Sequence, residues 1–221
     1  MHYLNIDAIR SSLLDIQHHF SDINSQLSVK RSPPSDEAIE NLLAGYAKID
    51  AYLAEDFNLF AMGNSHALLE LDYIVLFHSA DIEENEQNTQ FQATKQHFYE
   101  AEDGGIGGLM EWLELNDNTN VWKQVAGVFC YMVAQPQLFL EGNHRVATLV
   151  ASYLLMKEGH APLVVTVENA RLFFEISEQM KEKHKNSLIH EFFSLPRLTN
   201  SFAQLLEESQ SDAYLLKPAT V

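Results

Sequence analysis

A run of seven residues, 139–145, combines side chains and backbone features that suit a bound phosphate. It reads Phe-Leu-Glu-Gly-Asn-His-Arg, so a carboxylate, a glycine, an amide and two potentially cationic groups are consecutive. Apolar residues then recur at helical spacing from Val146 to Leu154, which predicts that a helix begins at this polar cluster. The free N–H groups and the positive dipole end of such a helix attract anions. Gly142 would let the backbone curl toward the anion without a Cβ in the way.

The same run resembles the central motif of Fic-domain proteins, a His-Pro-Phe-x-Asp/Glu-Gly-Asn-Gly-Arg-x-x-Arg segment that binds the phosphates of a nucleotide. The resemblance implies that Glu141 holds Mg²⁺ together with ATP or another nucleotide. It also implies a set of residues that line the nucleotide site: Gly142, Asn143, His144, Arg145 and Thr148. Weaker similarity extends over residues 60–200.

Three positions of the motif depart from the family pattern. The general-base histidine falls on Gln137, or on Gln135 if the loop is two residues longer. Glutamine does not accept a proton at neutral pH, and a positioned base is worth ~10²–10⁴-fold in rate. The second glycine of the motif is His144 here, and the second arginine is Thr148. These departures favour binding over the usual chemistry of the family.

Two functions stay open from the sequence. The first is a degenerate Fic-fold protein that binds a nucleotide or another phosphate-containing ligand, with weak or no transferase activity. The alternative is an active Fic-type adenylyltransferase, which moves AMP from ATP to a protein hydroxyl with a substitute base. His144 and His97 are the residues that could serve as that base. Without the flanking similarity, residues 141–145 would be an ordinary connector between two helices.

The resemblance also implies a docking place for a target protein. In Fic proteins the region before the motif forms a β-hairpin flap, which aligns a polypeptide by strand addition. The corresponding residues here lie near 91–108, although a loop without a ligand explains the same residues equally well. The family can also carry an inhibitory helix, and the nearest run is residues 36–41. Glu40 could be its blocking residue, yet the pattern arises easily in any acidic helix.

Composition excludes several classes of partner and site. The chain has 31 acidic and 14 basic residues and a net charge of −17, so its surface would repel nucleic acid and anionic lipid. Its ten histidines include no i, i+4 pair, and the single cysteine, Cys130, lies among apolar residues as a small buried hydrophobe. We find no signal peptide and no apolar stretch near the ~20 residues that span a bilayer. A cytoplasmic protein is expected.

Helical periodicity dominates the chain and predicts an all-α, Fic-like helical bundle. Ser35 is the expected N-cap of a helix through Leu53, and a central buried helix is expected over residues 68–77. The helices that contain Trp122 and Val146 should pack beside each other, joined by the motif loop. Further helices are expected at 172–180 and 202–206. A small hairpin could form within 90–108, and 163–167 could form one strand without an obvious partner.

With 221 residues, one domain or a domain with a helical extension is expected. We predict an N-terminal helical extension at 1–60, a Fic-like core at 61–200, and a C-terminal helix and tail at 201–221.

Overall fold

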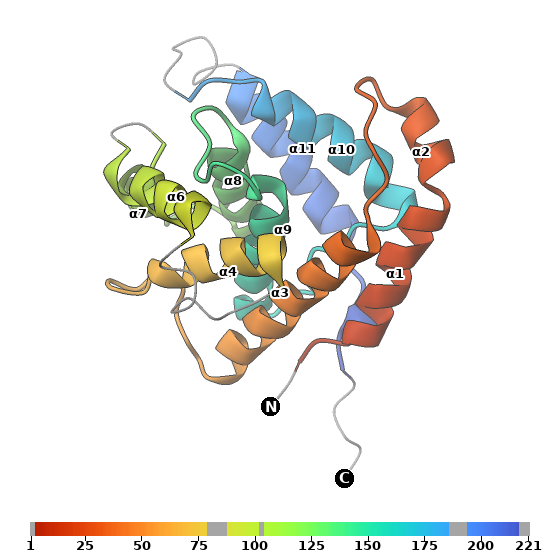
Figure 1. Ribbon diagram of the computed structural model, residues 1–221, viewed down its shortest axis with the longest axis horizontal. Coiled ribbons are helices and arrows are strands. Elements are labelled where there is room, and N and C mark those ends of the chain that lie inside the picture. The colour runs from red at the N-terminus through yellow and green to blue at the C-terminus, as the bar shows by residue number, and fades with distance from the viewer. Residues whose placement is uncertain (1–2, 79–87, 102–103, 186–193, 217–221) are drawn as a thin grey trace.

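A computed structural model describes residues 3–78, 88–101, 104–185 and 194–216. These ranges contain ten α-helices and a short 3₁₀-helix, and no β-strand is found in them (Figure 1). The all-α prediction is therefore confirmed for the described part of the chain. The helices are α1 Ile6–His18, α2 Phe20–Gln26, α3 Asp36–Ala54, α4 His66–Phe77, α6 Thr89–Glu100, α7 Ile106–Leu115, α8 Val121–Val133, α9 Asn143–Lys157, α10 Val167–Lys181 and α11 Leu195–Glu208, followed by η2 Asp212–Tyr214.

The central helix of the fold is α9, which is buried on nearly all sides from Val146 to Leu155. It packs against α8, α3 and α4, while α11 packs against α8 and α10. The predicted side-by-side pair of α8 and α9, joined by the motif loop 134–142, is confirmed. This arrangement holds the first turn of α9 among several helices.

The first helices close one side of the bundle. Helix α1 packs against α3 and α10, and α2 packs against α10 (Figure 1). The first and last described segments meet there, because Asn5 N–H donates to the Tyr214 carbonyl at 2.8 Å and Leu216 N–H donates to the Tyr3 carbonyl at 2.8 Å. Ser35 caps α3 as predicted, since its side chain accepts from the Ala38 N–H at 3.1 Å.

The hairpin that we expected within 90–108 is wrong, because this region contains the helices α6 and α7. Asn88 starts α6 by accepting from the Gln90 and Phe91 N–H groups. Phe91, Thr94 and Phe98 are all buried, which is the spacing of one helical face. Burial of this face, together with the cap, favours a helix over a hairpin.

The strand considered for 163–167 does not form either. Residues 163–166 lie outside regular structure, and Val167 begins α10. Side chains take the carbonyl groups that a strand would use: the Tyr46 hydroxyl donates to the Leu163 carbonyl at 2.5 Å, and Asn169 Nδ2 donates to the Val164 carbonyl at 3.0 Å.

Residues 4–49 contribute to the same hydrophobic cluster as the later helices, and the boundary predicted at 200/201 falls inside α11. The three-part division stays a prediction. Among the described helices, none combines the length and the apolar character that crossing a bilayer requires.

Candidate functional site

The motif loop is held by its own asparagine. Asn143 Oδ1 accepts from the Phe139 N–H at 2.8 Å, and its Nδ2 donates to the Phe139 carbonyl at 2.7 Å. Asn143 is only 4% exposed, and the Phe139 ring stacks on Phe98 at 5.4 Å between centroids. The amide that the resemblance places beside the phosphates therefore closes the loop instead.

An acidic side chain lies against the start of α9. Gly142 has the left-handed φ of 78°, and a Cβ there would meet the Asp72 carboxyl oxygen Oδ1. Asp72 is 3% exposed, and its Oδ1 has no hydrogen-bond partner among the described residues. Burial raises the pKa of Asp72 well above its ordinary value, although the charge of Arg145 acts in the opposite direction. A phosphate at Gly142 would have this carboxyl group as its neighbour.

Arg145 and Glu141 diverge from the loop. The Arg145 Nη1 donates to the Val75 carbonyl in the last turn of α4. A cation at this position stabilises the helix end, where carbonyl groups lack helical partners and the dipole is negative. Glu141 is exposed, and its Oε2 accepts from Gln90 Nε2 at 3.2 Å.

Glu141 is the carboxylate of the motif loop that a metal ion could contact. No group of three or more His, Cys, Asp or Glu side chains within the described ranges could hold an ion. Mg²⁺ often takes one or two carboxylates and completes its shell with water and substrate phosphates. Glu141 fits the role of a single carboxylate ligand of that kind, and the metal assignment stays a prediction.

Gln137 and His97 lie together where the resemblance expects a general base. Gln137 Nε2 donates to the Val133 carbonyl at 3.1 Å. His97 Nε2 lies 2.8 Å from the Gln137 carbonyl, which only accepts, so this nitrogen carries the proton. The structure thus brings His97 next to the position of the family histidine, with one ring nitrogen engaged as a donor.

His144 lies on another side of α9 and faces α10. Burial lowers its pKa to about 4, the charge of Arg31 acts in the same direction, and a hydrogen bond with the Ser177 backbone opposes them. Its Nε2 has no partner within the described residues. Thr148 is buried, and its hydroxyl donates to the His144 carbonyl at 2.8 Å. At neutral pH this half-buried histidine is uncharged.

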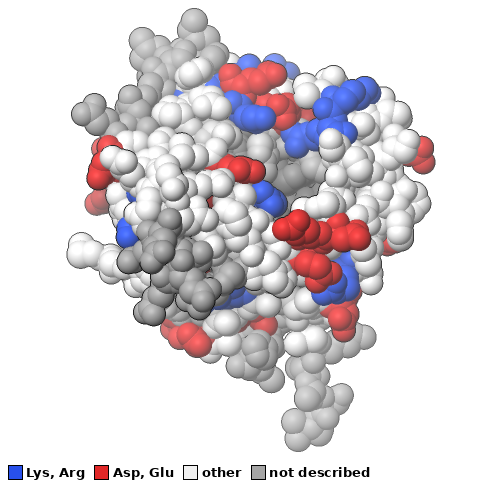
Figure 2. Space-filling model, in the orientation of Figure 1, with Lys and Arg blue, Asp and Glu red and all other residues white. Residues whose placement is uncertain are grey.

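A cavity of about 300 Å³ opens beside the first turns of α9, and we call it the Arg31–Arg145 pocket. Its polar lining is Arg31, Tyr46, His144, Arg145 and Thr148. The other walls come from α1, α3, α10 and the segments beside them: Leu13, Ile16, Pro34, Ala38, Ile39, Leu42, Val165, Phe173 and Phe174. Figure 2 shows a hollow in this face of the molecule with basic and acidic groups around it.

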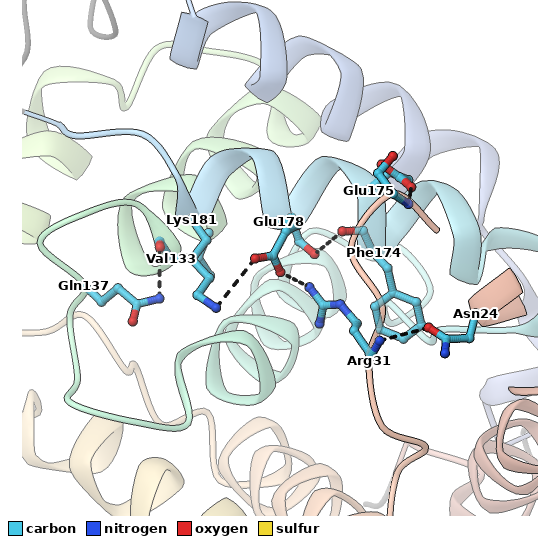
Figure 3. A network of polar contacts seen from close by, with 10 residues as sticks. Asn24, Arg31, Val133, Gln137, Phe174, Glu175, Glu178 and Lys181 are labelled. Atoms are coloured by element: carbon cyan, nitrogen blue, oxygen red, sulfur yellow. Dashed lines mark hydrogen bonds and ion pairs between the residues drawn. The ribbon is translucent and has the colours of Figure 1, made fainter. Parts of the chain in front are cut away.

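Arg31 is fixed at this pocket by three contacts (Figure 3). The Arg31 guanidinium pairs with Glu178, and its Cζ lies 5.0 Å from the centroid of the Phe174 ring. The backbone N–H of Arg31 donates to Asn24 Oδ1 at 2.9 Å. Lys181 Nζ lies 3.6 Å from the same Glu178. Sequence reasoning missed Arg31, because it lies in an irregular segment far from the motif along the chain.

The inhibitory role considered for Glu40 has a competing explanation. Arg10 binds both carboxylate oxygens of Glu40, and neither residue lines the Arg31–Arg145 pocket. The arginine lowers the pKa of this exposed carboxylate. The contact is an ion pair between α1 and α3.

No protein-family model matches this sequence, and a search of curated proteins finds no match. The likeness to Fic-domain proteins therefore rests on the motif residues and the weaker similarity over residues 60–200.

Proposed function

We propose that this protein binds a small organic anion in the Arg31–Arg145 pocket and does not transform it. The observation that carries the proposal is that two arginines, Arg145 from α9 and Arg31 from the segment before α3, line the same largely apolar cavity. Guanidinium groups pair well with phosphate and carboxylate oxygens, while the apolar walls suit an uncharged body. The motif resemblance favours a phosphate-containing ligand, and a nucleotide above all.

Charge supports an anionic ligand. The chain carries −17 overall, yet none of the described residues that line the pocket is acidic. Glu178 pairs with Arg31 and offsets part of its charge, while Lys181 adds a second cation beside Glu178. Local positive charge in a negative protein concentrates at this cavity, where an anion would find its partners.

Size and shape support a ligand with an apolar part. About 300 Å³ is at the lower end of the range of small-molecule pockets, ≈300–1,000 Å³. Phe173 and Phe174 offer aromatic surface, against which a planar ring can stack. The anionic group would then lie toward Arg31 and Arg145. If Mg²⁺ accompanies a nucleotide, Glu141 is the carboxylate that we expect to contact it.

The polar groups near the loop favour binding without transfer. Gln137 has no basic nitrogen, and His97 uses Nε2 as a donor to a carbonyl, which leaves only its Nδ1 to accept a proton. Burial lowers the pKa of His144 to about 4, which makes its imidazole a weak base. A transferase would need one of these groups to accept the proton of the attacking hydroxyl.

The test is calorimetry with ATP, ADP, AMP and inorganic phosphate, each with and without Mg²⁺. Arg31→Ala and Arg145→Ala should each weaken binding by roughly 10–150-fold, because a charge-assisted hydrogen bond is worth ~1.5–3 kcal/mol. Arg171→Ala is the matched control, since this exposed arginine lies on α10 outside the pocket. The proposal fails if none of the four anions binds, or if the control weakens binding as much as the pocket variants do.

A further inference from the structure

A second cavity lies among α7, α8 and the start of α11, and we call it the Lys185 cleft. Its volume is about 440 Å³, and it shares no lining residue with the Arg31–Arg145 pocket. Trp112 on α7, Tyr131 on α8 and Leu195 on α11 supply much of its apolar wall. Asn116 and Thr199 add polar groups. The cleft has the size and mixed lining of a small-molecule site.

Lys185 places its amine in this cleft. The Nζ donates to the Tyr131 carbonyl at 2.7 Å and lies 3.8 Å from the centroid of the Tyr131 ring. That carbonyl belongs to the last turn of α8, so the bond satisfies a helix-end acceptor and orients the amine. Within the described ranges Lys185 forms no ion pair, and none of the described residues that line the cleft is acidic. The amine therefore has an orienting partner and, among the described residues, no carboxylate that would hold it charged.

Burial lowers the pKa of the Lys185 amine to about 7, and Cys130 acts more weakly in the opposite direction. At pH 7 about half of such amines are neutral, whereas an ordinary lysine, with a pKa near ~10.4, is neutral in only ~4 of 10⁴ molecules. Burial also raises the pKa of the Cys130 thiol to about 11. The thiol thus stays protonated, and the amine is the nucleophile of the cleft.

We propose that the Lys185 cleft binds aromatic aldehydes and that the Lys185 amine captures them reversibly as an imine. The amine lone pair attacks the carbonyl carbon and gives a carbinolamine. Loss of water then forms the C=N bond: the aldehyde oxygen leaves with two hydrogens, both supplied by the neutral amine, and no electrons are gained or lost overall. Trp112 and Tyr131 would contact the aromatic ring, and the polar side chains of Asn116 and Thr199 would interact with its substituents.

The test is reductive trapping with benzaldehyde and cyanoborohydride at pH 7, followed by peptide mapping in a mass spectrometer. Lys123 is the matched internal control, because it lines the same cleft but is exposed. Lys185 should be labelled at least ~10-fold faster than Lys123, since the ~10³-fold excess of free base that Lys185 has over a reference lysine is partly offset by its burial and lower basicity. Acetaldehyde, which lacks the ring, should discriminate less between the two lysines.

Two variants sharpen the result. Lys185→Arg keeps a donor and a charge but removes the nucleophile, so it should abolish the dominant adduct, whereas Lys123→Arg should leave it unchanged. Labelling spread evenly over exposed lysines of the wild type would overturn the proposal. It would also be overturned if benzaldehyde and acetaldehyde gave the same ratio of Lys185 to Lys123 labelling. These two readouts use only the unaltered protein, so they decide the matter even if Lys185→Arg fails to fold.

Discussion

Asn143→Ala is the substitution whose effect follows most directly from the structure. The side chain pairs with both the N–H and the carbonyl of Phe139, and it is buried. Alanine would leave these two backbone groups without partners, and an unsatisfied buried polar group costs about 1–3 kcal/mol. The free energy of unfolding should fall by about 2–5 kcal/mol, which lowers Tm by roughly 4–20 °C in a chain of this size.

Urea unfolding followed by far-UV circular dichroism measures this loss. Asn143→Asp should cost at least as much as alanine, because a carboxylate oxygen would replace the donor that faces the Phe139 carbonyl and its charge would be buried. Asn200→Ala is the control, since Asn200 is exposed on α11, and we expect a change within about 0.5 kcal/mol. If Asn143→Ala is as stable as the control, the loop is not held by its asparagine and our account of Asn143 is refuted.

Three further predictions concern the same region. Asp72→Asn should stabilise the protein more at pH 8 than at pH 5, because the raised pKa of Asp72 means that ionising this buried carboxyl group opposes folding as pH rises. It should also tighten phosphate binding, and an equal gain in urea midpoint over the wild type at both pH values would contradict the pH dependence. For His144, the folded pKa of about 4 lies below the ordinary ~6.5, so the unfolded chain is protonated first as pH falls. Between pH 7 and 5 the free energy of unfolding of the wild type, measured by urea titration, should therefore fall by about 2 kcal/mol more than that of His144→Gln. Equal losses in the two proteins would count against a neutral imidazole at His144. With labelled ATP, the wild type should transfer no label to itself, Gln137→His should do so, and the double variant Gln137→His with His144→Gly should do so faster. A wild-type rate equal to that of the double variant would mean that another group, such as His97, is the base.

Much of the helical framework could be predicted from the sequence. Apolar residues at helical spacing mark α3, α4, α8 and α9, and the cap at Ser35 fixes the start of α3. The region 88–115 could not be predicted in this way, because a cluster of glycines also suits a flexible hairpin. Burial of Phe91 and Phe98 against the rest of the fold stabilises helices in this region. That burial depends on contacts between residues that are distant in the sequence, so a local pattern does not reveal it.

The candidate site shows a similar limit. Arg145 was named from the motif, and the structure places it in the lining of a cavity. Arg31 joins it only because α10 supplies Glu178 and Phe174 beside the segment before α3. The role of Asn143 within the loop and the approach of Asp72 to Gly142 also depend on contacts in space. Local patterns identify a polar loop, but they do not show which of its groups already have partners.

A crystal structure of the protein soaked with ATP and Mg²⁺ tests the central claim most directly. We expect phosphate oxygens within hydrogen-bond distance of the Arg31 and Arg145 guanidinium groups, with the base against the aromatic wall formed by Phe173 and Phe174. A nucleotide bound elsewhere, or a pocket that stays empty at saturating ligand, would contradict the account.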